Sequence, residues 1–291
     1  MPTILRKFTF VFFMMFLAGI SYTQDFAFGF KAGLTNTSVD GPLESLNNGT
    51  ELESIKSNGA FLLSLLVNAR FTDEFSLQGE LMYNQKGYNY RYNGPSYAIL
   101  RTANNEKFIF NGNRNMSLNV SNTYFQVPLS ASYKFFNRIE VQAGIYGSVL
   151  VQSTAAGTVT YSDIDAVDGE IEQTLSYNYR TNDAQSASPS AQQVTINNET
   201  YTVSSQVEAY YDYETKDKSL FRGIDAGYHA GLNLYINQSL FIGARYSKSI
   251  MDINRNAVDR TYQNLDNNDN LIFKNDEDKY SVLEFTIGFS F

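Results

Sequence analysis

The most regular feature of this sequence is an alternation of apolar and polar positions with a period of two. Residues 26–35 (FAFGFKAGLT) place Phe, Ala and Leu on one face and Gly, Lys and Thr on the other, and residues 280–291 (YSVLEFTIGFSF) alternate in the same way. Successive side chains of a β-strand point to opposite faces, so this pattern predicts strands with one apolar face. It recurs in six further segments: 60–71, 75–86, 123–135, 139–151, 224–236 and 240–248. We therefore expect an all-β chain of eight strands.

The connections between these segments alternate in length. Short turns are expected at 72–74, 137–138 and 237–238, and every other connection is long, the longest covering about 152–222. Strict alternation of this kind is typical of an antiparallel transmembrane β-barrel with short periplasmic turns and long extracellular loops. A soluble β-sandwich is the alternative, but in a sandwich there is no reason for short and long connections to alternate along the chain. Tyr-rich tracts at 88–97 and 210–213 leave open whether strands continue beyond the bilayer.

The first residues have the features of an export signal. Arg6 and Lys7 precede an apolar run over 8–20, and small residues follow before Gln24. This run is short for a membrane-spanning helix, so we expect a cleaved signal peptide over 1–23 rather than an uncleaved anchor. No later run reaches the roughly 18 apolar residues of a spanning helix, so residues 24–291 can cross a membrane only as a closed barrel.

Composition narrows the class of partner. The chain has 22 Lys and Arg against 30 Asp and Glu, a net charge of -8, which argues against nucleic acid as a partner. It contains no Cys, so disulfides and thiolate metal sites are excluded. An aromatic fraction of 15% in a chain of mean hydropathy -0.30 fits strands that separate apolar from polar residues finely.

Several of the strand segments resemble the PorT-like outer-membrane β-barrel family of Gram-negative bacteria. The resemblance rests on FGFKAGL at 28–34, LQGELMYNQKGY at 77–88, YFQVPLSASYKF at 124–135, VQAGIYGSVL at 141–150, DAGYHAGLNLYI at 225–236 and the final LEFTIGFSF. It implies a location in the cell outer membrane. It also implies that Phe291, with Phe289 and Phe285, forms the carboxy-terminal signal read by the barrel-assembly machinery. One member is linked to a secretion system, an activity that the shared fold does not transfer.

The inward faces of the expected strands carry charges of both signs. They are Lys31, Arg70, Glu80, Lys86, Glu140, Asp225, His229, Arg245 and Glu284. Eight strands enclose a lumen just wide enough for side chains to fill, so we expect these groups to pair in a polar network. A narrow channel or proton path is the alternative, and an open porin would need about 16 strands.

Catalysis and metal binding have weaker support in the sequence. His229, the single His, would be the relay of a lipid-modifying enzyme, but it is expected to face the lumen and no Ser stands near it in a recognisable motif. Residues 266–277 place Asp266, Asn268, Asn270 and Glu277 at the offsets of a calcium loop, yet Leu271 stands where the turn needs Gly. We therefore expect no catalytic residue, no cofactor and no dedicated metal site.

The expected function is that of a non-enzymatic outer-membrane protein, structural or partner-binding through its extracellular loops, or a subunit of an envelope or secretion complex. The alternatives are a lipid-modifying enzyme and a narrow channel. Expected partners are outer-membrane lipid, lipopolysaccharide, the assembly machinery and a protein or glycan at the loops. The hydroxyl-rich stretch 161–217 is either a recognition surface or a solvated loop.

Overall fold

A computed structural model describes residues 25–104, 106–165 and 167–291 of the chain. The expected signal peptide, residues 1–23, lies outside this part. Eight long strands dominate the fold: β1 (Asp25–Asp40), β2 (Glu53–Arg70), β3 (Phe75–Arg101), β4 (Lys107–Phe135), β5 (Ile139–Ser162), β10 (Ile224–Tyr235), β11 (Leu240–Ser249) and β14 (Lys279–Ser290). Within the described ranges, no helix has the length and apolar character needed to cross a bilayer.

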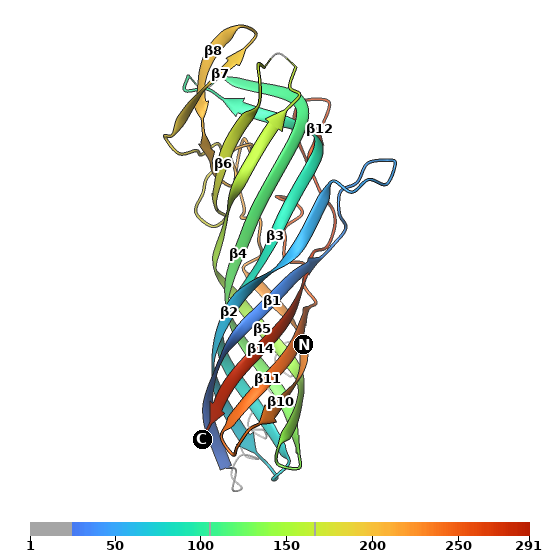
Figure 1. Cartoon of the computed structure of the whole chain (residues 1–291), viewed down its shortest axis with the longest axis vertical. Helices are drawn as coiled ribbons and strands as arrows, with labels where there is room; N and C mark the ends of the chain where they lie inside the picture. Colours follow the sequence, from blue (N-terminus) through green and yellow to red (C-terminus); the bar gives the residue numbers. More distant parts are fainter. Residues whose placement is uncertain (1–24, 105, 166) are drawn as a thin grey trace, which may run out of the picture.

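These eight strands form one closed ring. The order is β10-β11-β14-β1-β2-β3-β4-β5, and pairing of β5 with β10 closes it. Every neighbouring pair in the ring is antiparallel. Closure leaves no unpaired edge inside a bilayer, where unpaired backbone groups are costly. The predicted eight-stranded antiparallel barrel is confirmed (Figure 1).

Short turns join the strands at one end of the ring, at 71–74, 136–138 and 236–239. The two ends of the barrel sheet meet at the same place, because Phe291 and Phe28 exchange backbone hydrogen bonds of 2.8 and 3.0 Å there. This end is the one predicted to face the periplasm.

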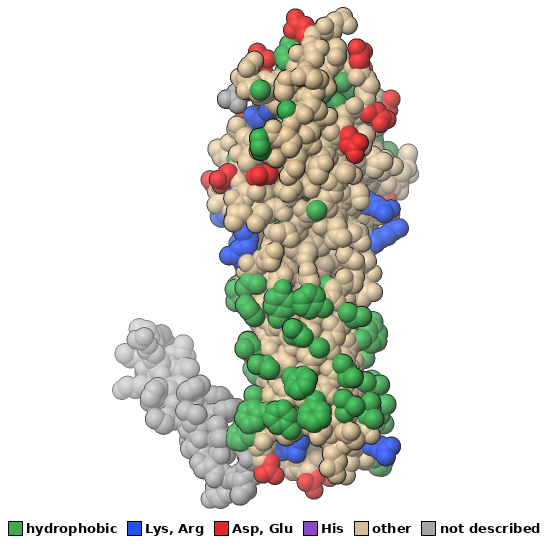
Figure 2. Space-filling view, turned by 60° about the vertical axis from the view of Figure 1, so that its left-hand side comes forward, with side chains coloured by type: hydrophobic (Ala, Val, Ile, Leu, Met, Phe, Trp, Pro, Cys, Tyr) green, Lys and Arg blue, Asp and Glu red, His purple; other side chains and the backbone are tan. Residues whose placement is uncertain are grey.

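A belt of exposed apolar side chains surrounds the half of the barrel next to the short turns (Figure 2). Its residues alternate along each strand, as in Phe26, Phe28 and Phe30 of β1, which are 52–55% exposed. Such a continuous apolar surface on a monomer is explained by contact with lipid. The residues between the exposed ones point inward, and most of them are small, polar or charged, so the lipid-out, lumen-in pattern expected from the sequence is present.

Three ring strands continue far beyond the belt. β3, β4 and β5 extend into a twisted sheet that also takes up β6 (Ile171–Asn178) and β9 (Gln206–Val207). Two small hairpins, β7 (Ala191–Ile196) with β8 (Glu199–Ser204) and β12 (Arg260–Leu265) with β13 (Leu271–Phe273), complete this extracellular part (Figure 1). Most of 87–122, expected as a loop, is therefore strand, and 152–222 is folded β-structure with a core rather than a plain loop.

The apolar face of the strands changes sides at the upper edge of the belt, from the outside of the barrel to its inside. Within the belt β4 turns Phe125, Val127 and Leu129 outward, whereas above it Met116 and Leu118 turn inward and are 1% and 4% exposed. The interior of the extracellular part is a core of buried aliphatic and Tyr side chains. This part of the chain therefore follows the rule of a water-soluble β-protein, while the belt follows the rule of a membrane protein.

Candidate functional site

The lumen inside the belt holds a network of buried charges. Lys31 Nζ of β1 lies 2.8 Å from Glu80 Oε2 of β3, and Arg245 Nη1 of β11 lies 2.8 Å from the other oxygen of Glu80. Arg245 Nε also lies 2.6 Å from Glu284 Oε2 of β14. Two cations and two carboxylates thus neutralise one another across the lumen, with all four side chains at most 4% exposed. Burial of charge on this scale requires such pairing.

A second pair lies nearer the extracellular side. Lys86 Nζ is 2.7 Å from Asp225 Oδ2, and both side chains are 1% exposed. Three aromatic rings surround the ammonium group, with the ring centres of Tyr124, Tyr146 and Tyr280 at 4.7, 5.2 and 4.9 Å. Ring faces are attractive to a desolvated cation, so this pair is enclosed by aromatic side chains on the path between the lumen and the extracellular core.

Polar and aromatic groups also fill the periplasmic side of the lumen. Glu140 accepts hydrogen bonds from Asn233 Nδ2 at 2.8 Å and from the Tyr235 hydroxyl at 3.3 Å. Tyr235, Phe241 and Leu66 form a small buried cluster beside them.

One of the nine charges expected in the lumen lies elsewhere. Arg70 is exposed at the very end of β2, where it lines the wide periplasmic mouth with Asp25 and Glu74. Arg70 occupies a position of β2 that faces inward, as predicted. It is the last residue of the strand, however, so its side chain lies in solvent at the mouth of the barrel. The other eight residues are buried inside the ring, and Phe285, Phe289 and Phe291 lie on its lipid-facing surface.

The structure brings a serine to His229. Ser130 Oγ of β4 lies 2.8 Å from His229 Nε2, a contact that sequence spacing did not reveal. The other ring nitrogen, Nδ1, is buried without a hydrogen-bond partner among the described residues. A Ser–His–acid set requires an acid at that nitrogen, and both side chains face the lumen rather than lipid. The pair therefore fits a structural contact better than a nucleophile and its base.

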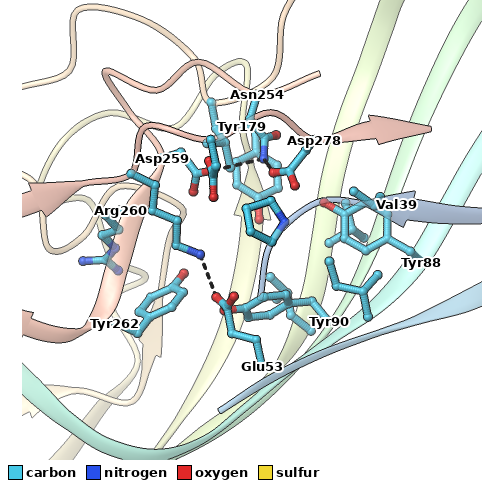
Figure 3. A pocket seen from close by; sticks show the side chains of 17 residues that line it. Val39, Glu53, Tyr88, Tyr90, Tyr179, Asn254, Asp259, Arg260, Tyr262 and Asp278 are labelled. Atoms are coloured by element: carbon cyan, nitrogen blue, oxygen red, sulfur yellow. Dashed lines mark hydrogen bonds and ion pairs between the residues drawn. The ribbon is translucent and has the colours of Figure 1, made fainter. Parts of the chain in front are cut away.

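The extracellular part contains a pocket of about 80 Å³ where strands and loops from the whole chain converge (Figure 3). One wall is aromatic and aliphatic, with Tyr88 and Tyr90 of β3 and Tyr262 of β12. Tyr88 and Tyr90 point the same way because they are two residues apart on a strand. The other wall is polar and mostly acidic, built by β2, by the loop before β12 and by the segment between β13 and β14.

The basic side chain nearest the acidic wall, Lys274, is already neutralised. Lys274 Nζ lies 2.8 Å from Glu53 Oε1 and 3.1 Å from Glu44 Oε1. The Tyr90 hydroxyl donates a further hydrogen bond of 2.5 Å to Glu53. Arg260, also at the pocket, pairs with Asp212 at 2.6 Å.

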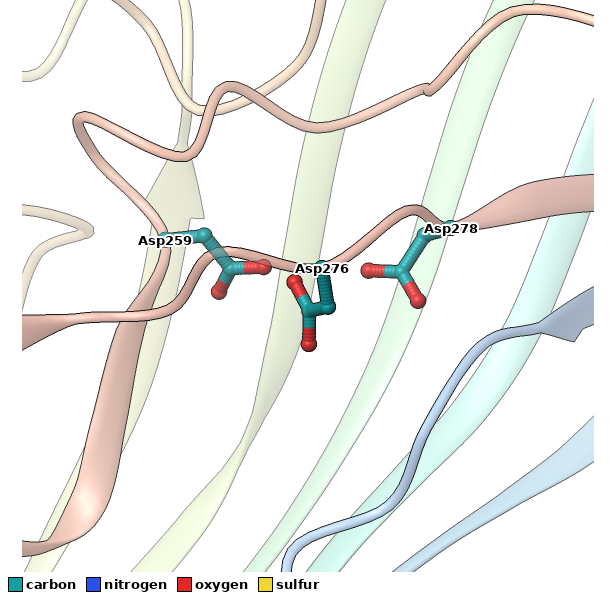
Figure 4. Close-up of side chains that lie close together, drawn as sticks. All are labelled: Asp259, Asp276 and Asp278. Carbon is teal, nitrogen blue, oxygen red and sulfur yellow. The ribbon is translucent and has the colours of Figure 1, made fainter.

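Three further carboxylates in this wall form no ion pair within 4.0 Å among the described residues, although the charge of Lys274 acts on each of them. Each of Asp259, Asp276 and Asp278 offers an oxygen, and these atoms lie within 4.8 Å of one another (Figure 4). The Asn254 amide nitrogen bridges two of them, at 3.2 Å from Asp259 and 2.6 Å from Asp278. Its carbonyl oxygen is buried without a partner among the described residues. All three carboxylates are partly exposed, so a solute can reach them.

Burial raises the pKa of all three carboxyls. The pKa of Asp259 rises to about 7 from its usual 3.8. Burial is the largest cause, the charge of Lys274 opposes it, and repulsion by Asp278 and Asp276 adds to the rise. The pKa of Asp278 rises to about 6, again first through burial and then through Asp276. Crowded carboxylates with raised pKa values attract a cation, because a positive charge removes the repulsion between them.

We expect this acidic group to titrate near neutral pH. Carbon-detected NMR of the carboxyl groups in lipid nanodiscs should give midpoints near 7 and 6, shared between the coupled residues. A carboxyl pKa raised by folding makes the folded form less stable as pH rises from the unfolded to the folded pKa. The stability of these loops should therefore fall between about pH 4 and pH 7, and Asp259→Asn should weaken that dependence. Midpoints near 3.8 would contradict the arrangement.

The residues of the calcium loop considered from the sequence make contacts with one another and with Lys279. Asp266 accepts hydrogen bonds from the backbone of Asn268 and Asn270, both at 2.8 Å, and so closes the β12–β13 turn. Glu277 pairs with Lys279 at 2.5 Å instead of joining them. The acidic residues that do converge, Asp259 and Asp278, are separated in sequence and meet only through the fold.

A comparison with protein-family models identifies the relatives of this chain. The model described as "Outer membrane protein beta-barrel domain" matches residues 21–255, which is most of the sequence. The chain belongs to this outer-membrane β-barrel family. Membership and the closed, lipid-belted ring together place the protein in the outer membrane. The narrower resemblance to PorT-like members stays a prediction.

Solved structures with similar strand arrangements are distant in sequence. Ail, the attachment invasion locus protein of Yersinia pestis, solved with the heparin analogue sucrose octasulfate, is 10% identical with a TM-score of 0.37, over 92% of this chain and 99% of that one. OprG from Pseudomonas aeruginosa is 11% identical with a TM-score of 0.36, over 92% and 97%. Similarity at this level carries no argument about ligands. No curated protein matches the sequence.

Proposed function

We propose that this protein is a non-enzymatic binding protein of the outer membrane, which receives a positively charged group of an extracellular partner in its acidic, Tyr-walled pocket. The observation that carries the proposal is the group of Asp259, Asp276 and Asp278, which forms no ion pair in the described structure because the neighbouring Lys274 pairs with Glu44 and Glu53. Carboxylates beside aromatic faces are the usual surroundings of a bound ammonium or guanidinium group. Hydrogen bonds from Asn254 hold Asp259 and Asp278 together without a ligand.

The two alternative functions have less support. A lipid-modifying enzyme would need its nucleophile at the lipid surface, and the Ser130–His229 contact is inside the lumen. A narrow channel would need a continuous polar path, but the ion pairs of Glu80 and the aromatic enclosure of Lys86 cross the lumen at two levels. The barrel is therefore better suited to hold the extracellular part than to conduct.

Binding of model cations tests the proposal. Calorimetry on the full chain in nanodiscs would use spermidine, arginine amide and Ca²⁺ as separate probes. We expect an organic cation to bind, and Asp259→Asn/Asp278→Asn to weaken binding at least about tenfold, since each charge-assisted contact contributes about 1.5–3 kcal/mol. The matched control is Asp165→Asn/Asp168→Asn, which removes two exposed carboxylates outside the pocket and should bind as the wild type does.

The outcomes separate the candidate occupants. Binding of Ca²⁺ alone, abolished by the same double variant, would replace the organic cation with a metal ion, which three oxygens within 4.8 Å could also hold. Equal binding by the pocket variant and the wild type would refute the pocket as the site. A steady current through the wild-type protein in planar bilayers would instead favour the channel.

A further inference from the structure

A second pocket, distinct from the acidic one, lies at the upper edge of the lipid belt. It has a volume of about 400 Å³ and is lined by Arg180, Lys218 and Arg255 together with Leu150 and Gly223. Its size is that of a small-molecule site. Three cationic side chains and no carboxylate line it, in a chain whose net charge is -8.

The position of this pocket relative to the membrane follows from its two strands. Gly223 immediately precedes Ile224, the first residue of β10, and Ile224 pairs with Val149 of β5. Ile224 and Val149 are 57% and 55% exposed on the apolar belt. The backbone of Leu150 donates a hydrogen bond to Gly223 at 2.8 Å, and Arg180 Nη1 donates to the carbonyl of Leu150. The guanidinium of Arg180 is therefore held one residue from the lipid-facing surface.

The cations of the pocket are available to a ligand. In the described parts of the chain, no ion pair involves Arg180, Lys218 or Arg255. Arg180 and Lys218 are exposed, while Arg255 Nη1 holds the carbonyls of Ser219 and Phe221 at 2.6 and 2.5 Å. On the face drawn in Figure 2, Lys and Arg side chains lie directly above the belt, and the Asp and Glu side chains above the belt lie mostly farther from it.

We propose that this pocket binds a phosphate group of an anionic glycolipid of the outer leaflet, with lipopolysaccharide as the source. Arg and Lys are the side chains that bind phosphate through charge-assisted hydrogen bonds. A lipid phosphate lies at the level where the apolar belt ends, and its acyl chains would follow Val149 and Ile224 along the barrel. A soluble phosphate has the same head-group chemistry but gains nothing from the adjoining apolar surface.

Lipid retention by the full-length barrel tests this assignment. The purified protein in detergent would be incubated with diphosphorylated lipid A, with its dephosphorylated form and with inorganic phosphate, and bound species counted by native mass spectrometry. The test variant is Arg180→Gln/Lys218→Gln, which leaves Arg255 to hold its loop. The matched control is Lys56→Gln/Arg91→Gln, which removes one exposed Lys and one exposed Arg outside the pocket. Heat-dependent gel mobility would confirm that each variant is folded.

We expect the wild type and the control to retain diphosphorylated lipid A, and the test variant to lose at least about tenfold in affinity. The charge-conserving Arg180→Lys/Lys218→Arg should recover most of that loss. Equal retention by wild type and test variant, or equal loss in the control, would overturn the proposal. Inorganic phosphate binding as tightly as the lipid would overturn the lipid source and assign the pocket to soluble phosphate. These results do not depend on Asp259 or Asp278, so they stand apart from the proposal for the acidic pocket.

Discussion

Glu80→Ala is expected to lower the free energy of unfolding of the barrel by about 3–5 kcal/mol, the usual cost of removing one partner from a buried ion pair. Glu80 is the only carboxylate within 4.0 Å of Lys31 in the described structure, and it shares Arg245 with Glu284. It also accepts hydrogen bonds from Ser64 at 3.1 Å and Gln78 at 3.0 Å. Its loss leaves one uncompensated positive charge inside the membrane-embedded lumen.

Urea unfolding in lipid vesicles, followed by the heat-modifiable gel shift, would measure this effect. Glu172→Ala, which removes an exposed Glu from β6, is the matched control and should change stability by less than about 0.5 kcal/mol. A Glu80→Ala barrel as stable as the control would show that water or lipid head groups reach the lumen and solvate Lys31, so that the buried network is not what stabilises it.

Lys86→Met is expected to cost about 3 kcal/mol, and the added change Asp225→Asn is expected to recover at least half of that loss. The single change leaves Asp225 buried at 2% exposure with only the Tyr146 hydroxyl, 3.3 Å away, as a hydrogen-bond donor to the side chain. In the double variant both charges are gone, and the Tyr146 hydroxyl still has Ser249 at 3.1 Å.

A double-mutant cycle on the same unfolding assay measures the coupling between these two side chains. A large positive recovery identifies the loss in Lys86→Met as the cost of an unpaired carboxylate. Additive effects of the two changes would instead mean that Lys86 stabilises the barrel through its three Tyr rings rather than through Asp225.

The sequence predicts the belt well because lipid imposes a simple rule on it. Phe26, Phe28 and Phe30 can only be outward on a strand in a bilayer, and the residues between them then fall inward. The lumen residues followed from the same parity. Arg70 is the exception because it lies at the last position of β2, where the inside of the barrel is open to solvent.

The extracellular part was harder to predict because its alternation carries the opposite chemistry. Met116 and Leu118 face inward, and the polar residues between and beside them face outward: Asn115, Ser117 and Asn119. A search for strands with an apolar outer face therefore classifies this segment as a polar loop. A search for alternation with a period of two that does not assume which face is apolar would identify this strand. The Asp259–Asp278 group gives no such signal, because only the folded loops bring the two residues together.

The lumen network has a consequence for the order in which the barrel is built. Its four charges come from β1, β3, β11 and β14, the first and last strands of the ring among them. A chain inserted only as far as β5 holds Lys31 and Glu80 as an isolated pair, and one inserted as far as β11 adds a cation whose second carboxylate has not yet arrived. The balance that Arg245 disturbs is restored only when β14 brings Glu284 and joins β1. A barrel inserted as far as β11 thus carries one unbalanced positive charge among these four groups, and closure of the seam removes it.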